Sequence, residues 1–147
     1  MSRELLFSCI FAFGATVAFG VLFHAPRKSL TVTGLIGALG WMIFFYFTKE
    51  HNYNTFYVNF AASLMVALLG ELSARIFKQP ATIFVIPGII PLVPGLGMYQ
   101  GMLQIIDKSY DEGVRIIIVA AMDSAAIALG MMFMASLFRL LKPIRYQ

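Results

Sequence analysis

Long apolar stretches alternate with short polar segments along the whole chain. A transmembrane helix needs about 20 predominantly apolar residues. Stretches that meet this length cover residues 5–23, 30–48, 55–77 and 114–138, and a fifth covers residues 81–106. The pattern predicts an all-α integral membrane protein with about five transmembrane helices, folded as a single polytopic domain over residues 1–147.

The stretch of residues 81–106 has no charged side chain, yet it holds three prolines and four glycines. Proline removes a backbone donor and clashes with the preceding turn, and glycine raises the entropic cost of a helix. We therefore expect a discontinuous helix whose first half ends near Ile86 and whose second half begins at Pro94. The alternative is a re-entrant segment, which leaves four spans.

Such a break has two interpretations. In transporters, two half-helices expose amide donors and carbonyl acceptors that hold an amino acid or a carboxylate. Here the segment from Val93 to Gly97, except for Pro94, would supply free amides at a positive helix end. Alternatively, the prolines and glycines only shape a kinked packing element, because both residues are frequent in membrane spans. The pattern leaves both interpretations open.

Small residues at helical spacing predict where helices approach closely within the membrane. In the first span these are Gly14 and Ala18. In the second span, glycines recur every three residues at Gly34, Gly37 and Gly40. In the last span, the small side chains are those of Ala121, Ser124, Ala125 and Ala128.

Ionisable residues inside spans are costly and often functional. Glu71 and Arg75 are four residues apart near the end of the third span, so they share a helix face and can pair. Either they mark the membrane border or they belong to a conduction pathway. Asp123 lies about a third of the way along the last span. It is a candidate for proton coupling, and the alternative is a hydrogen-bonded structural carboxylate.

Composition agrees with a membrane location. Of 147 residues, 60% are hydrophobic and 12% are charged, and the mean hydropathy is +0.83. A soluble globular domain does not have this composition. The net charge of +4 comes from residues near span ends, so it indicates orientation and does not imply nucleic acid. We expect a multi-pass protein of the cell (inner or plasma) membrane.

The distribution of Lys and Arg predicts the orientation, because cytoplasmic loops carry an excess of both. With five spans, one side collects seven cations: Arg27, Lys28, Arg75, Lys78, Arg139, Lys142 and Arg145. The other side collects four: Arg3, Lys49, Lys108 and Arg115. This imbalance places the C-terminus in the cytoplasm. With a re-entrant segment, the count becomes six against five.

The motifs of catalysis and cofactor binding are missing from the sequence. Cys9 is the single cysteine, so it has no thiolate partner for a metal cluster. His24 and His51 are isolated near span ends. The glycines at positions 95 and 97 lack the rest of a dinucleotide fingerprint. We therefore expect no enzyme activity, no metal and no cofactor.

Several motifs together resemble the threonine/serine exporter family. They include Phe-His-Ala-Pro-Arg at residues 23–27, the glycine-rich second span, residues 63–70 leading to Ser-Ala-Arg at residues 73–75, and Tyr99. The most specific motif is Lys-Gln-Pro-Ala-Thr-Ile-Phe-Val-Ile-Pro-Gly-Ile-Ile-Pro-Leu-Val-Pro-Gly at residues 78–95. The similarity covers roughly residues 5 to 138. The chain is most similar to the small, half-length subunit of the split two-component form.

The resemblance implies secondary export of a small hydrophilic molecule, such as threonine, serine or a dicarboxylate like succinate. It also implies a larger membrane subunit as partner, and a homo-oligomer is a further possibility. The alternative is a non-transporting scaffold or assembly subunit. If the chain transports, we expect the substrate pathway to include Pro87, Gly88, Pro91, Pro94, Gly95, Gly97, Tyr99 and Gln100, with Glu71, Arg75 and Asp123 as polar or coupling residues.

Overall fold

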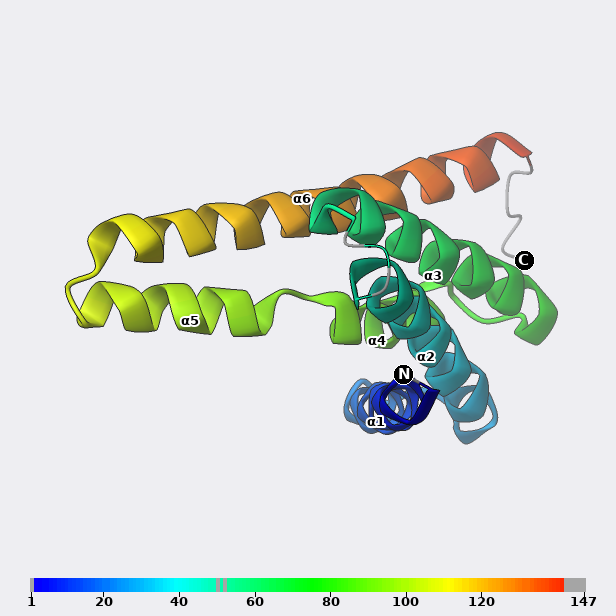
Figure 1. Cartoon of the computed structure of the whole chain (residues 1–147). Helices are drawn as coiled ribbons and strands as arrows, with labels where there is room; N and C mark the ends of the chain where they lie inside the picture. Colours follow the sequence, from blue (N-terminus) through cyan, green and yellow to red (C-terminus); the bar gives the residue numbers. More distant parts are fainter. Residues whose placement is uncertain (1, 50, 52, 142–147) are drawn as a thin grey trace.

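The computed structural model describes residues 2–49, 51 and 53–141 (Figure 1). Every regular element in these residues is helical. Four helices are long and apolar enough to cross a membrane: α1 (Ser2–Leu22), α2 (Arg27–Lys49), α3 (Thr55–Phe77) and α6 (Tyr110–Leu141). The predicted all-α membrane fold is therefore confirmed. Two cations of the charge count, Lys142 and Arg145, lie outside the described residues.

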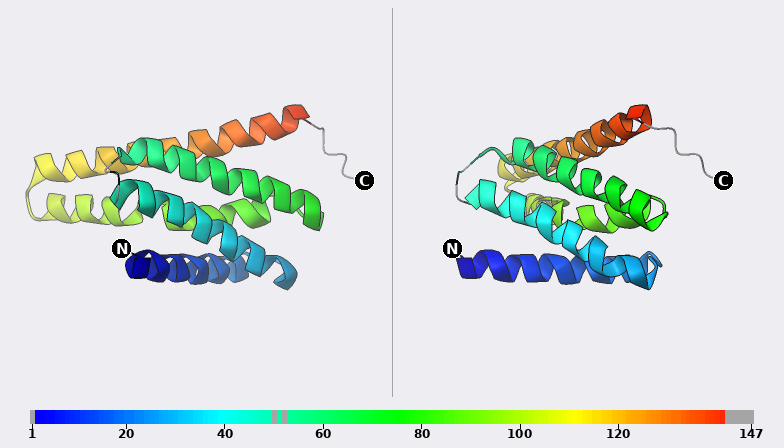
Figure 2. Two further views of the ribbon diagram at one scale, coloured as in Figure 1. Left: turned by 45° about the vertical axis from the view of Figure 1, so that its right-hand side comes forward. Right: turned by 90° about the vertical axis from the view of Figure 1, so that its right-hand side faces the viewer.

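A broken helix follows α3. It consists of α4 (Thr82–Ile89), the 3₁₀ turn η1 (Ile90–Leu92) and α5 (Gly95–Ile106), with a bend of 43° between its halves. In Figures 1 and 2, α4 and α5 run one after the other in the same direction. At 1.5 Å per residue, the two pieces together are about 35 Å long, and the hydrocarbon core of a bilayer is about 30 Å thick. Both observations fit a broken crossing better than a re-entrant loop.

Helices end where the sequence supplies local stop signals. Three residues at or just after helix ends adopt the left-handed conformation, namely His24 (φ 57°), Lys78 (φ 53°) and Lys108 (φ 64°). Pro26 and Pro80 each follow two residues after such a position, and proline cannot continue a helix. These signals explain why the predicted spans fall close to the observed helices, although the membrane borders themselves stay predictions.

The helices are not all packed in the same way. α2 and α3 pack against each other and against α4, and the C-terminal part of α6 covers α3. The core between them contains Ile36, Ala62, Val66, Ala74, Phe84, Ile89, Leu92 and Ile127. α1 packs on α2 and runs crosswise to α6. α5 packs mainly on the first half of α6. These two segments form a hairpin that extends away from the other helices (Figure 1).

Glycines allow several helix backbones to touch. A Cβ atom at Gly130 of α6 would lie 2.8 Å from the carbonyl oxygen of Phe60 and would overlap the hydroxyl of Ser63. In the same way, a Cβ at Gly37 of α2 would overlap Thr16 of α1. Only glycine permits these approaches, which hold α6 on α3 and α2 on α1.

Two of the expected small-residue contacts are wrong. Gly14 and Ala18 are exposed, and no atom lies within 4 Å of a Cβ placed at Gly14. The buried positions of α1 are Ala12, Thr16 and Gly20. On α6, the buried small residues are Gly113, Ala120, Ala126 and Gly130, and not Ala121, Ser124, Ala125 or Ala128. Small residues occur on more than one side of both helices, so their spacing does not select the packed face.

Candidate functional site

The break in the α4–α5 helix lies later than the sequence predicts. α4 continues through Pro87 to Ile89, instead of ending near Ile86, and η1 extends the coil to Leu92. Pro87, Gly88 and Ile89 are buried. A Cβ at Gly88 would lie 3.2 Å from side-chain atoms of α2 and α3. Packing against these helices compensates for the hydrogen bond that proline cannot make.

Val93 and Pro94 form the break itself. Val93 is extended, with φ −61° and ψ 127°, and Pro94 precedes the first residue of α5. The amide of Val93 donates to the carbonyl of Ile90 (3.1 Å), and the first hydrogen bond within α5 runs from the Met98 amide to the Pro94 carbonyl (3.1 Å). The sequence therefore predicts the start of the second half to within one residue.

Fewer amides are free at the start of α5 than the sequence suggests. The Val93 amide is already bonded, and the Gly95 amide donates to the Val93 carbonyl (2.7 Å). The amides of Leu96 and Gly97 lie in the first turn, where a helix offers no acceptor of its own. The positive end of α5 thus presents two amides without a helical partner, and such a position favours anions.

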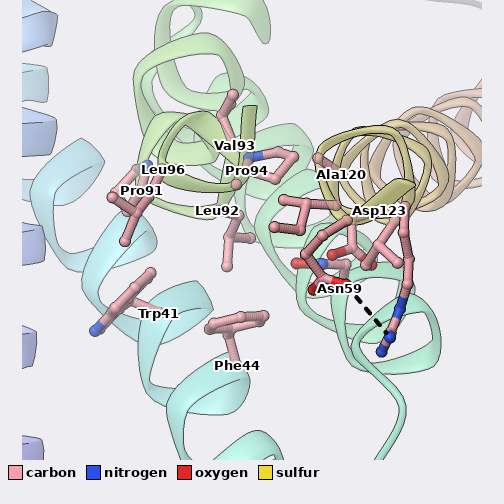
Figure 3. A pocket seen from close by; sticks show the side chains of 15 residues that line it. Trp41, Phe44, Asn59, Pro91, Leu92, Val93, Pro94, Leu96, Ala120 and Asp123 are labelled. Carbon is pink, nitrogen blue, oxygen red and sulfur yellow. Dashed lines mark ion pairs between the residues drawn. The ribbon is translucent and has the colours of Figure 1, made fainter. Parts of the chain in front are cut away.

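A cavity of about 480 Å³ lies beside this break (Figure 3). Helices α2, α3 and α6 and the segment from η1 to α5 all contribute to its wall. The lining residues are Trp41, Phe44, Asn59, Pro91, Leu92, Val93, Pro94, Leu96, Gly97, Glu112, Arg115, Ile116, Val119, Ala120 and Asp123. The α6 members recur three or four residues apart, so they form one face of that helix. Their spacing makes the cavity elongated along α6.

Two buried polar side chains line the cavity. Asn59 is 1% exposed and Asp123 is 8% exposed. Asn59 comes from α3 and Asp123 from α6 (Figure 3). The Oδ1 atom of Asn59 has no hydrogen-bond partner. The carboxyl group of Asp123 makes no hydrogen bond or ion pair with the residues that the structure describes.

The cavity lining also includes an exposed ion pair. Arg115 and Glu112 form an ion pair at 3.7 Å, and their side chains are 77% and 53% exposed. Exposed pairs of this kind contribute little to stability. Arg115 and Asp123 are eight residues apart, which is about 12 Å along the α6 axis. The two residues are therefore about two helical turns apart on α6.

Of the predicted pathway residues, Pro91, Pro94 and Gly97 line the cavity together with Asp123. Pro87 and Gly88 are buried in the packing of α4. Gly95, Tyr99 and Gln100 are exposed and do not line it. The structure therefore brings the break and the Asp123 carboxylate together, as the pathway hypothesis requires, but assigns part of the motif to packing.

The expected pairing of Glu71 with Arg75 does not form in the structure. The guanidinium of Arg75 instead lies 4.6 Å from the ring centre of Phe138, and its Nη2 donates to the Phe138 carbonyl at 3.4 Å. This contact fastens α3 to the end of α6 through a cation–π interaction. Neither Glu71 nor Arg75 lines the cavity. The long Arg75 side chain instead reaches Phe138 on the neighbouring helix α6.

Sequence reasoning missed most of the cavity lining, including Asn59, Trp41 and Phe44. Asn59 was visible only as a weakly polar position on the third span. Trp41 and Phe44 belong to a cluster that is typical of a membrane interface, yet both line the cavity. Periodicity alone cannot identify them, because the element that each residue faces depends on how the broken helix packs against α2, α3 and α6. A polar side chain in an otherwise apolar span is the one signal that points to Asn59.

The comparisons with known proteins agree with this arrangement. A family model described as "Threonine/Serine exporter, ThrE" matches residues 8–137. An uncharacterized protein of Haemophilus influenzae is 26% identical over 154 residues, which cover 96% of this chain and 50% of that protein. A threonine/serine exporter of Corynebacterium glutamicum is 31% identical over 125 residues, which cover 84% of this chain and 25% of that protein.

The chain thus spans half or less of the length of these relatives. No solved structure matches it. The matched region contains the complete cavity lining, from Trp41 to Asp123, as well as the broken helix. With a family model that covers most of its length, the chain belongs to the threonine/serine exporter family.

Proposed function

We propose that this chain is a membrane subunit of a secondary exporter of small hydrophilic metabolites, and that the cavity beside the α4–α5 break is its substrate site. Membership of the exporter family and four apolar helices support a multi-pass membrane protein with a role in export. The observation that carries the proposal is the meeting of a helix break, two free amides and a buried carboxylate in one cavity. Transporters bind substrates at such breaks.

The α4–α5 helix crosses the membrane in this proposal, which makes five spans and places the two chain ends on opposite sides. The direction and length of its two halves support a crossing. The excess of Lys and Arg on the side of the C-terminus then makes that side cytoplasmic. Asp123 is the coupling candidate, since it lies in the cavity, whereas Glu71 does not.

A larger partner subunit completes the exporter. The support is that the curated relatives are at least twice as long as their matched regions. In addition, the α5–α6 hairpin carries exposed large apolar side chains that do not line the cavity, among them Met102, Ile106, Ile118 and Met122. A larger family member from the same organism is the partner to test. The proposed substrates of this exporter include both hydroxy amino acids and dicarboxylates.

Efflux measurements test the proposal. Cells preloaded with labelled threonine, serine or succinate are expected to export at least one of them faster when they express both this chain and the larger family member. Either protein alone serves as the control, and blots of membrane fractions show that both are inserted. Unchanged efflux of all three compounds with both proteins present contradicts the proposal and favours a scaffold.

A further inference from the structure

Three polar groups of the cavity lining have no partner among the residues that the structure describes. Asn59 of α3 is 1% exposed, and its Oδ1 atom accepts no hydrogen bond. The indole Nε1 of Trp41 on α2 is buried and donates none. Asp123 of α6 is 8% exposed and forms neither a hydrogen bond nor an ion pair. Because unpaired polar groups are costly in an apolar interior, each of the three requires a partner that these residues do not supply.

Water is the partner that matches all three groups. The Oδ1 atom of Asn59 and an ionised Asp123 accept hydrogen bonds, whereas Nε1 of Trp41 only donates. In Figure 3, Trp41 lies apart from Asn59 and Asp123, so a single ion of either charge satisfies only part of the set. Water both donates and accepts, and it occupies polar cavities in protein interiors. The cavity, at about 480 Å³, far exceeds the roughly 15 Å³ that one water molecule requires.

The cavity lining leads along α6 from a buried residue to exposed, charged ones. Asp123 is buried. Arg115 and Glu112 lie about two and three turns nearer the start of the helix, and their side chains are 77% and 53% exposed. The α5–α6 loop at residues 107–109 carries two further charges. Such a concentration of charge places a loop in water or among lipid headgroups. Water therefore has access to the cavity from the side of this loop.

On the other side of Asp123, α6 and α3 close against each other. Gly130 follows Asp123 by seven residues, or about two turns. A Cβ at Gly130 would lie 2.8 Å from the carbonyl oxygen of Phe60 and would overlap the hydroxyl of Ser63. Ala126, which lies between Asp123 and Gly130 on α6, is 0% exposed. Helices in such close contact leave no passage for water between them.

We propose that Trp41 and Asn59 bind ordered water in this cavity, and that this water connects Asp123 with the side of the α5–α6 loop only. The inference rests on the proposed function, in which Asp123 is the coupling residue, and adds the side from which its proton comes. Among the lining residues, α2, α3 and the segment from η1 to α5 contribute only uncharged side chains. With the proposed cytoplasmic C-terminus, the loop lies outside the cell, where an inward proton gradient supplies protons.

The fluorescence of the full chain in lipid nanodiscs tests the water site, because Trp41 is the single tryptophan. Indole emits more strongly in D2O than in H2O when its N–H group exchanges with water, and hydration moves the emission to longer wavelength. The wild type is expected to give a D2O/H2O intensity ratio above one. Asn59→Leu removes an acceptor at similar volume and is expected to lower this ratio and to shift the emission to shorter wavelength.

Thr33→Val is the matched control for this measurement. Thr33 is buried on the same helix as Trp41 but does not line the cavity. Its hydroxyl already donates to the Ser29 carbonyl at 2.8 Å. The variant is therefore expected to keep the wild-type emission and the wild-type ratio. A ratio that Asn59→Leu leaves unchanged overturns the water site.

Thiol modification tests the side of access. Asp123→Cys is made in a chain with Cys9→Ser and is co-expressed with the larger partner, in right-side-out and in inverted membrane vesicles. A small membrane-impermeant thiol reagent is expected to modify position 123 only from the side on which it modifies Ser109→Cys in the α5–α6 loop. Adding Asn59→Leu is expected to slow the reaction at position 123 about tenfold and to leave that at position 109 unchanged.

Modification from the opposite side, or equally from both sides, overturns the inference. A cavity filled by a lipid chain also overturns it, and gives no reaction at position 123 while position 109 reacts. The fluorescence assay keeps Asp123 native, so it decides the case if Asp123→Cys does not insert. Neither assay uses a substrate. Unchanged efflux despite one-sided hydration contradicts the proposed function alone, and export by a chain with a dry cavity contradicts this inference alone.

Discussion

Replacing Asp123 with asparagine is expected to reduce substrate efflux by at least about tenfold, the factor that corresponds to about 1.4 kcal/mol. The change keeps the shape of the side chain but removes a carboxylate from the cavity lining. Hydrogen bonds to a charged group contribute about 1.5–3 kcal/mol, so a loss of this size follows if Asp123 contacts the substrate. The measurement is the initial efflux rate from preloaded cells at equal membrane expression.

The pH gradient supplies a second measurement for the same variant. If the Asp123 proton takes part in coupling, residual efflux by Asp123→Asn is expected to depend less on the gradient than wild-type efflux. Glu71 is the other carboxylate that was a candidate for coupling. The variant Glu71→Gln is expected to behave as the wild type. Wild-type efflux with unchanged gradient dependence in Asp123→Asn would remove this residue from the mechanism.

Replacing Gly97 with leucine is expected to reduce efflux by more than about tenfold, because its side chain would occupy the cavity. Gly97 lines the cavity, and a Cβ at this position would lie 3.4 Å from the Cβ of Ala120. Packed interiors tolerate little added volume. The matched control is Gly95→Leu. Gly95 has no atom within 4 Å of an added Cβ and does not line the cavity. Both changes raise helix propensity similarly, by up to about 1 kcal/mol.

The outcome of this pair also separates the two interpretations of the proline-glycine segment. In a substrate pathway, Gly97→Leu strongly reduces efflux while the subunit still assembles with its partner, and Gly95→Leu impairs neither efflux nor assembly. In a packing element, Gly97→Leu impairs co-purification with the partner to the same extent as efflux. Equal loss of efflux in both variants would contradict the position of the cavity.

The sequence predicts the helices well, because their ends carry local signals. Polar loops and the prolines at positions 26 and 80 interrupt apolar stretches, and these signals act over a few residues. The broken helix is predictable for the same reason. Its first half extends past Ile86 only because tertiary packing covers Pro87 and Gly88, and local propensity contains no information about that packing.

The site is only partly predictable. Pro91, Pro94, Gly97 and Asp123 could be selected from motif and polarity, since breakers and carboxylates are rare in apolar spans. Their proximity to Trp41, Phe44 and Asn59 depends on the crossing of four segments that are distant in sequence. The pairing of Glu71 with Arg75 failed for a related reason. Helical spacing permits that contact, but a neighbouring helix offered Arg75 the ring and carbonyl of Phe138.

The central claim is that substrate occupies the cavity beside the helix break. The variant Ala120→Cys tests this claim, because Ala120 is a buried residue of the cavity lining. The substitution is made in a chain in which Cys9→Ser has removed the single native cysteine. Ala125→Cys, on the exposed side of the same helix, is the control. A small water-soluble thiol reagent is expected to modify the cysteine at position 120 in assembled membranes, and threonine is expected to slow that reaction but not the one at position 125. Absence of modification at position 120, or modification that no exported compound slows, would contradict a substrate site in this cavity.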